Sequence, residues 1–327
     1  MTPPAAVATG QAEVESALES HRRELTGYCY RMLGSGAEAE DAVQETMVRA
    51  WRSAGRFEGR SSLRSWLYRI ATNVCLDMHR SPQRRARPMD LGPATPAAGA
   101  APGPEHPEAM WVQPVADEAV LDLSGDPAEV AAARESIRLA FVAALQHLPA
   151  RQRAVLILRE VLRWPAAEVA ELLDASVASV NSALQRARAT LASIPAERLD
   201  AIVDPEHEAL LARYVDAFER YDISALVALL RHDVVLSMPP YAIHLVGPDD
   251  LAAWFLGPGI GCRGGRLVPV AANGTAAFGN YRCRRPGLWE PFAIQVIEVA
   301  GGRISGHHNF LYPELFARFG LPPRIEE

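Results

Sequence analysis

Apolar positions recur at helical spacing in the first part of the chain and predict a helical domain over residues 12–82. A first helix is expected over residues 12–33, followed by a turn at residues 34–36. The next helix, from Asp41, is expected to bury Val43, Met47, Ala50, Trp51 and Ala54 and to expose Asp41, Gln44, Glu45 and Arg49. A third, capped by Ser61 or Ser62, has the apolar stripe Leu63, Trp66, Leu67, Ile70, Ala71 and Val74. Its other faces carry Arg64, Tyr68, Arg69, Thr72, Asn73 and Arg80.

Residues 83–126 are rich in proline and alanine, and this composition predicts a linker that does not fold by itself. The apolar triplet Met110-Trp111-Val112 is the exception, and we expect it either to dock on a neighbouring domain or to have no role. Asp126-Pro127 then caps a second helical domain, residues 127–194. A long helix to about residue 147 is followed by helices over 150–162, 165–173 and 177–192, and the last two form a helix-turn-helix.

The segment 205–327 changes to an α+β pattern. Two helices and a third beginning at Gly247-Pro248 are combined with short β-rich runs punctuated by Gly and Pro, which predicts an antiparallel, curved sheet. The expected strands are 234–238, 243–246, 267–271, 276–281, 291–299 and 304–310. The fold class is therefore multidomain: two all-α domains and a C-terminal α+β domain.

The sequences DAVQETMVRAW and RSWLYRIATNVCLD, in this order, resemble region 2 of bacterial RNA polymerase sigma factors of the extracytoplasmic-function (ECF) group. The resemblance implies that Asp41, Gln44, Glu45 and Arg49 bind the clamp helices of the polymerase's largest subunit. It also implies that the loop and helix that follow hold the single-stranded −10 element, through Phe57, Arg60, Ser62, Arg64, Trp66, Tyr68 and Asn73. Aromatic and cationic side chains suit unpaired bases. The alternatives are that Trp51 and Trp66 belong to the core, and that Asp41 and Glu45 lie on a solvated, Arg-paired face.

Residues 148–191 resemble sigma region 4, which binds the −35 element in the major groove and contacts the polymerase flap. This implies that the predicted recognition helix contacts DNA through Ser179, Asn181, Ser182, Gln185 and Arg186. A basic residue is commoner in the family at the position of Asn181, so the promoter sequence stays open.

The C-terminal segment resembles the cone-shaped SnoaL-like domain, and ECF sigma factors that carry one form a subgroup in which it is thought to replace a separate anti-sigma protein. The candidate pocket residues are Tyr214, His244, Trp254, Asn280 and His307. His308 follows His307 on a strand, so at most one of the two faces the pocket. The resemblance implies a regulatory domain, with a small-molecule ligand as one option. The alternatives are a SnoaL-like isomerase or cyclase with DNA-binding targeting domains, and a plain helix-turn-helix repressor.

Composition refines this interpretation without changing it. The net charge of −6 and the pI of about 5.9 argue against a purely nucleic-acid-binding protein, although a sum over the whole chain hides local patches. All cationic side chains besides histidine are arginine, and the four cysteines have no metal-binding spacing. No apolar run approaches the roughly 18 residues of a membrane span, and no secretion signal is apparent. We therefore expect a cytoplasmic transcription initiation factor without catalytic activity, cofactor or metal.

Overall fold

The computed structural model describes residues 18–54, 57, 61–78, 85–97, 103–193 and 205–327, which fall into two compact units. Unit 1 contains the described residues of Met1–Arg84 and Glu118–Pro195. Unit 2 contains those of Arg85–Asp117 and Ala196–Glu327. The chain thus leaves unit 1, contributes the segment 85–117 to unit 2, returns to unit 1, and ends in unit 2.

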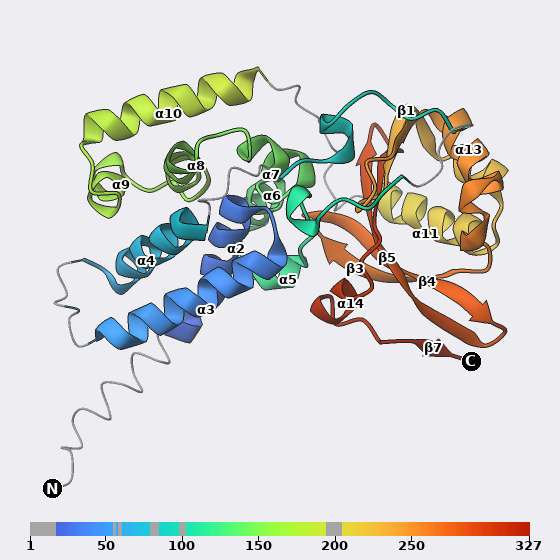
Figure 1. Ribbon diagram of the computed structural model, residues 1–327, viewed down its shortest axis with the longest axis horizontal. Coiled ribbons are helices and arrows are strands. Elements are labelled where there is room, and N and C mark those ends of the chain that lie inside the picture. Colours follow the sequence, from blue (N-terminus) through green and yellow to red (C-terminus); the bar gives the residue numbers. More distant parts are fainter. Residues whose placement is uncertain (1–17, 55–56, 58–60, 79–84, 98–102, 194–204) are drawn as a thin grey trace, which may run out of the picture. The chain divides into compact units, whose positions relative to one another are not determined.

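The first half of unit 1 is built from α2 (Arg22–Leu33), α3 (Gly36–Ser53) and α4 (Leu63–Met78) (Figure 1). Gly34 ends α2 in the left-handed region with φ 74°, and the Ser35 hydroxyl caps α3 by accepting a hydrogen bond from the Glu38 N–H. The Ser62 hydroxyl accepts a hydrogen bond from the Ser65 N–H at the start of α4. The predicted helices are present in the described part of this region.

The second half of unit 1 contains α6 (Pro127–Glu135), α7 (Leu139–Leu145), α8 (Ala150–Leu156) with its π-helical continuation η5 (Ile157–Val161), α9 (Ala166–Leu172) and α10 (Val177–Ala192). The expectation of one helix from residue 126 to 147 is wrong, because the helix is interrupted between α6 and α7. At this break the Arg31 guanidinium donates to both the carbonyl and the hydroxyl of Ser136. The backbone at Ser136 thus bonds a side chain from α2.

A buried arginine joins the two halves of unit 1. Arg153 on α8 donates to the carbonyls of Leu145 and Leu148, at 2.9 and 3.1 Å, and to the carbonyl of Met32 at the end of α2. It also donates to Gln146 Oε1 at 2.7 Å. Helix-terminal carbonyls have no partner within their own helix, so one cation satisfies several of them at once. The two helical regions are therefore packed together inside one unit.

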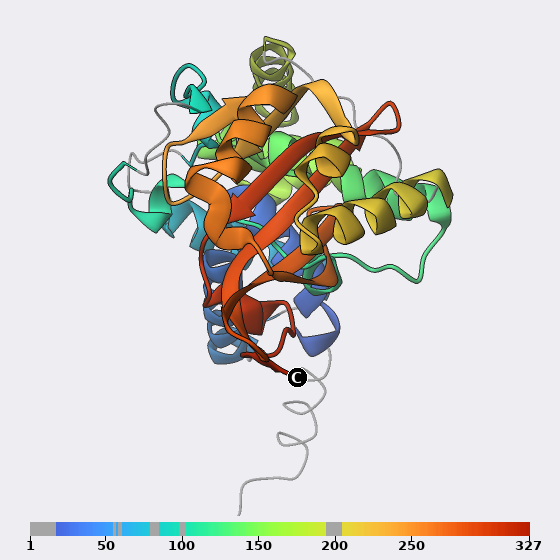
Figure 2. The same cartoon turned by 90° about the vertical axis from the view of Figure 1, so that its right-hand side faces the viewer.

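Unit 2 is a sheet covered by helices α11 (Pro205–Glu219), α12 (Ile223–Val227) and α13 (Pro248–Leu256), which Figure 2 shows in yellow and orange. The strands are β1 (Leu230–Ser237), β2 (His244–Val246), β3 (Arg266–Ala272), β4 (Thr275–Arg285), β5 (Leu288–Ala300) and β6 (Arg303–Phe310). Their order is β2-β1-β6-β5-β4-β3, and β7 (Ile325–Glu326), which follows α14 (Leu315–Arg318), pairs with β5. The antiparallel prediction is wrong for one pair: β1 and β6 are parallel, so the sheet is mixed.

The proline-rich segment 85–117 is ordered where it is described, with two short helical turns, η2 (Pro88–Asp90) and η4 (Glu108–Met110), and α5 (Asp117–Val120) beginning at its end. Val115 exchanges two hydrogen bonds with Asn273, both of 3.1 Å, and Asp117 accepts one from the Gly274 N–H. Trp111 is fully buried. Composition predicts no core of its own for this segment, and in the structure it obtains hydrogen-bond partners from the turn between β3 and β4.

Candidate functional site

The exposed face of α3 combines polar and apolar side chains. Asp41, Gln44 and Glu45 are exposed, as expected, and Arg49 bonds Glu45 at 2.6 Å and Asp77 at 3.4 Å. Val48 and Trp51 are 41% and 48% exposed on the same face, whereas Val43, Thr46 and Ala50 point into the core. The placement of Trp51 in the core is therefore wrong. Val48 lies seven residues after Asp41, which is two helical turns. This i, i+7 spacing would have predicted that Val48 is exposed on the same face as Asp41.

The side chains expected to hold single-stranded DNA are divided between open and covered positions. Ser62 and Asn73 are exposed, and the half-buried Trp66 stacks against Phe57 with a centroid distance of 5.0 Å. Arg60 lies outside the described residues. Tyr68 and Thr72, expected off the apolar stripe, are buried. Their hydroxyls find partners inside unit 1, since Thr72 bonds Tyr28 at 2.8 Å.

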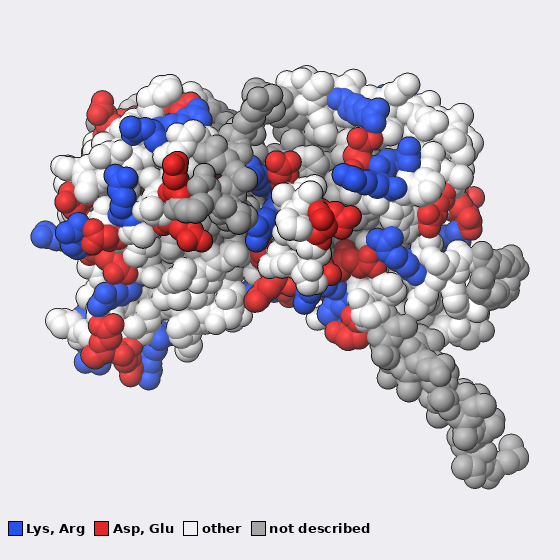
Figure 3. Space-filling model, turned by 180° about the vertical axis from the view of Figure 1, so that it is seen from behind, with Lys and Arg blue, Asp and Glu red and all other residues white. Residues whose placement is uncertain are grey.

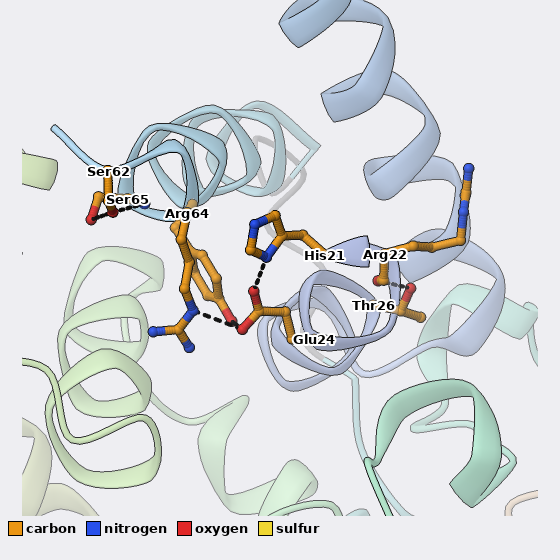
Figure 4. Close-up of polar contacts among 8 residues, drawn as sticks. His21, Arg22, Glu24, Thr26, Ser62, Arg64 and Ser65 are labelled. Atoms are coloured by element: carbon orange, nitrogen blue, oxygen red, sulfur yellow. Dashed lines mark hydrogen bonds and ion pairs between the residues drawn. The ribbon is translucent and has the colours of Figure 1, made fainter. Parts of the chain in front are cut away.

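Tyr68 and Arg64 are covered by a residue from the second half of unit 1. The Tyr68 ring lies 4.9 Å from that of Trp164, and the Arg64 guanidinium lies 5.0 Å above the same indole. Both side chains also bond Glu24 on α2. The Arg64 guanidinium does so at 2.8 Å (Figure 4), and the Tyr68 hydroxyl does so at 3.3 Å. Burial raises the pKa of Tyr68 well above that of free tyrosine.

Helix α9 extends this cover along α4. The Ser65 hydroxyl donates to Glu168 Oε1 at 2.6 Å, and Arg69 donates to the Glu171 carbonyl at 3.3 Å. Because Ser65, Tyr68 and Arg69 lie on one face of α4, the contacts with α9 and Trp164 block that face. A base cannot stack on Tyr68 in this conformation.

The five candidate residues of the recognition helix all lie on the exposed side of α10. These are Ser179, Asn181, Ser182, Gln185 and Arg186. Val180, Leu184 and Ala187 anchor the opposite side, and the Ser176 hydroxyl caps the helix through the Ser179 N–H. Val177 lies at helical spacing with these apolar residues, which predicts burial, but it is 44% exposed. Apart from Val177, helical periodicity thus indicates which side of α10 is exposed and which is buried.

Acidic and basic side chains are interspersed on the face of the molecule that Figure 3 shows, and they do not form one continuous basic surface there. The net charge of −6 agrees with this distribution. Any nucleic-acid contact on this face would therefore depend on individual side chains more than on a broad electrostatic field.

Unit 2 contains a cavity of about 280 Å³ between the sheet and α13. Of the five residues predicted for a pocket, Trp254 lines it. The other lining residues are Leu236, Met238, Tyr241, Ile243, Phe255, Pro258, Gly259, Cys262, Arg282, Phe292, Gln295, Asn309 and Leu311. Most of these were missed because they come from several strands and loops that only the tertiary fold brings together. His244 and Asn280 are buried elsewhere in the unit.

Tyr214 and His307 form a buried hydrogen-bonded chain that ends at two lining residues of the cavity. The Tyr214 hydroxyl donates to Gln295 Oε1 at 2.9 Å and lies 2.7 Å from His307 Nε2. Asn309 Nδ2 lies 2.9 Å from His307 Nδ1. All three bonds form when His307 is neutral with its proton on Nε2. Burial is the main cause that lowers the pKa of His307 to about 3.

His308 lies on the opposite face of the sheet from His307, as the alternation of a strand predicted. Its Nδ1 is 2.8 Å from the Ser237 hydroxyl and its Nε2 is 3.2 Å from Glu298 Oε2. All three residues are buried, and none of them lines the cavity. The three side chains thus bond one another in the interior, away from the cavity.

The enzyme alternative depends on which titratable groups line the cavity. No Asp or Glu is among the described residues that line it, and His307 is held neutral behind the wall. General acid–base catalysis would need a titrating group within reach of a substrate. Among the described residues, no cluster of three or more His, Cys, Asp or Glu is arranged to hold a metal ion. Nor is any helix there long and apolar enough to cross a membrane.

Known proteins match nearly the whole chain. Residues 17–85 match sigma-70 region 2, residues 138–191 match sigma-70 region 4, and residues 211–307 match the SnoaL-like domain. The ECF RNA polymerase sigma factor SigG of Mycobacterium tuberculosis H37Rv is 45% identical over 313 residues, which cover 94% of this chain and 83% of SigG. SigJ of the same strain is 29% identical over 324 residues, which cover 94% and 95% of the two chains. The crystal structure of M. tuberculosis SigJ shares the fold, with a TM-score of 0.59 at 24% identity over 94% of this chain and 99% of that one.

Proposed function

The chain belongs to the ECF family of RNA polymerase sigma factors. We propose that helix α3 binds the polymerase and that helices α4 and α10 recognise the promoter. The family assignment confirms the resemblance of both helical regions and of the C-terminal SnoaL-like domain. Sigma factors bind core RNA polymerase and promoter DNA and direct transcription initiation. The assignment of individual residues to these partners is our proposal.

Helix α3 docks on the clamp helices of the largest polymerase subunit in this proposal. Support comes from its exposed face, where Val48 and Trp51 stand beside Asp41, Gln44 and Glu45. An apolar centre with a charged rim is typical of protein interfaces. A purely solvated helix face would not need to expose a tryptophan.

The DNA contacts are assigned to α4 and α10. Trp66, Phe57 and Asn73 offer stacking and hydrogen-bonding groups for the opened −10 element, and Arg64 and Tyr68 would join them once uncovered. On α10, Asn181, Gln185 and Arg186 have the donors and acceptors that read base edges or phosphates in the −35 element.

We propose that access to α4 is regulated, and the observation that supports this is that residues of region 4 cover one face of α4. Trp164, Glu168 and Glu171 from region 4 contact the same face of α4 that offers Arg64 and Tyr68. We interpret this arrangement as a closed state that has to open before the −10 element can bind. The segment 85–117, which joins region 2 to region 4, is held by the SnoaL-like domain, and this docking would limit opening.

Polymerase-dependent transcription tests the proposal. The full chain is mixed with core enzyme on a promoter library, alone and with one of two substitutions, Val48→Glu on α3 or Gln185→Ala on α10. We expect promoter-specific transcripts from the unmodified chain, loss of core binding with Val48→Glu, and intact core binding with altered −35 preference with Gln185→Ala.

Arg213→Gln, on the exposed side of α11, serves as a control because it removes one surface charge outside all three helices. If Val48→Glu bound core enzyme as well as the control did, the docking role of α3 would be refuted. Retention of an unchanged −35 preference by Gln185→Ala would remove Gln185 from the reading face.

A further inference from the structure

The cavity of unit 2 presents one cation to an otherwise uncharged interior. Arg282 on β4 is the charged residue among those that line it. Glu290 faces Arg282 across β4 and β5, but its carboxylate is engaged by Arg284 at 2.7 Å. No ion pair to Arg282 is found within the described residues, and its buried Nε has no hydrogen-bond partner there. The cavity therefore contains a cation that forms no ion pair with a carboxylate in the described part of the chain.

The stacking of Arg282 keeps its hydrogen-bond donors available. Its guanidinium lies 3.6 Å from the ring centroid of Phe292, so the aromatic ring occupies the face of the planar group. The N–H groups of a guanidinium lie in its plane and remain free to form the paired bonds that carboxylates accept. Stacking thus fixes the orientation of Arg282 without using the atoms that would bind an anion.

One other polar lining residue, Gln295, also offers donors to an acceptor ligand. The Oε1 of Gln295 is occupied by the Tyr214 hydroxyl, which leaves the amide N–H groups of Gln295 as donors. The rest of the wall is mainly apolar, with Leu236, Met238 and Trp254 among its members. The volume of about 280 Å³ is at the lower end of that of small-molecule sites. Burial raises the pKa of the Cys262 thiol, whereas its hydrogen bond and charge contact with Arg282 lower it. The neutral thiol is therefore only a weak partner of the guanidinium and not a counter-ion.

The same loop that forms one wall of the cavity also holds the docked segment 85–117. Met238, Tyr241 and Ile243 line the cavity. The Tyr241 hydroxyl donates to Glu105 at 2.9 Å, the Pro240 carbonyl accepts from the His106 N–H at 3.0 Å, and the His244 carbonyl accepts from the Thr95 N–H at 2.8 Å. A ligand that moves this loop would therefore act on bonds that fasten the segment.

We propose that the cavity binds a small organic carboxylate with an apolar body, held by Arg282, and that its occupancy alters the docking of residues 85–117 through the loop 238–243. The binding site stands on unit 2 alone. Its regulatory consequence rests on the proposed role of the docked segment in the closed state.

The test uses three probes with the same apolar chain and different head groups: octanoate, octan-1-ol and octylammonium. Binding to the full chain is measured by calorimetry. Because a hydrogen-bonded charge contact contributes about a factor of ten or more, we expect octanoate to bind at least about tenfold more tightly than octan-1-ol. Octylammonium should bind most weakly. Equal affinities for the three probes, or no binding of octanoate at millimolar concentration, would overturn the proposal.

Substitutions then locate the contact. Arg282→Gln should lower the affinity for octanoate about tenfold and leave that for octan-1-ol within about threefold, since it removes the charge and keeps the apolar walls. Arg282→Lys retains the charge and should retain the preference for octanoate, which guards against a folding defect in the first variant. Arg213→Gln is the charge-matched control outside the cavity. An octanoate preference that survives in folded Arg282→Gln would refute the role of Arg282.

Hydrogen exchange measures the coupling to the docked segment. Saturating octanoate should change the exchange rate of the His106 and Val115 amides, and Tyr241→Phe should reduce this response because it removes the bond to Glu105. Exchange that is identical with and without bound octanoate would refute the coupling. Transcription assays are not needed for either result, so a failure here is distinct from a failure of the sigma-factor assignments.

Discussion

Removal of the Glu168 carboxylate should favour the open form of unit 1. Glu168→Ala eliminates the 2.6 Å bond from the buried Ser65 hydroxyl and leaves the fold of α9 intact. Hydrogen bonds to charged groups contribute about 1.5–3 kcal/mol, and partial exposure of Glu168 places this one near the lower value. About 1.4 kcal/mol corresponds to a tenfold change in an equilibrium. We therefore expect the open form to become about tenfold more populated.

The assay is the apparent Kd of the full chain for a fluorescently labelled single-stranded −10 oligonucleotide, measured by fluorescence anisotropy. If only the open form binds, the apparent Kd is the intrinsic value divided by the open fraction. Glu168→Ala should therefore bind up to about tenfold more tightly when the closed form predominates in the unmodified chain.

Glu171→Ala provides a matched comparison because it removes the same charge from the same helix. The Glu171 side chain is 64% exposed and lies 3.6 Å from Arg69, while the bond from Arg69 to the Glu171 carbonyl survives the substitution. Exposed pairs contribute about 0–1 kcal/mol, so the change in Kd should stay below about fivefold. Equal effects of the two substitutions, or no effect of Glu168→Ala, would refute the reasoning that the α4–α9 contact limits DNA binding to α4.

Three further predictions concern other parts of the chain. Val48→Glu should weaken core binding at least about tenfold without lowering the melting temperature, because this exposed side chain would be desolvated only in the complex; tight binding in a titration with core enzyme would contradict it. Arg153→Ala should destabilise unit 1 by about 3 kcal/mol or more in urea unfolding, since it leaves buried carbonyls without donors. The control Arg188→Ala breaks an exposed pair with Glu160 and should lower the free energy of unfolding by less than about 1 kcal/mol. His307 has a lowered pKa of about 3 in the folded chain, so the unfolded chain binds the proton more tightly and stability is lost as pH falls from 6.5 towards 3. The slope should reach about 1.4 kcal/mol per pH unit for unfolding of unit 2, and His307→Gln should remove this contribution; the same slope in both proteins would contradict the assignment.

Much of the fold could be predicted because periodicity reports which side of an element is buried. The exposed side of α10 and the opposite orientations of His307 and His308 follow from the helical and strand repeats alone. Repeats cannot report which polar groups find a partner inside. Tyr68 and Thr72 were expected outside, but bonds to Glu24 and Tyr28 permit their burial. In the same way, the helical repeat does not show that the Arg153 guanidinium is buried, because its partners are carbonyl groups at the ends of other helices.

The sites that were missed depend on contacts between distant segments. The cavity takes its wall from several strands, α13 and the loop at residues 238–243, so no local pattern could place Arg282 and Trp254 in the same cavity. The segment 85–117 was expected to be a linker because its composition cannot supply a core. Its order comes from Asn273 and neighbouring backbone groups, which lie far away in the sequence.

The long separation between the segment 85–117 and its docking site gives the protein an order of assembly. Val115 and Asn273 lie 158 positions apart, and at synthesis rates of about 5–20 residues per second the second follows the first by about 8–30 s. During this interval the nascent chain contains region 2 and the segment, but the strands that hold the segment have not yet been made. A restraint that depends on docking can therefore begin only late in translation, and a chain that stops before β3 and β4 would escape it altogether.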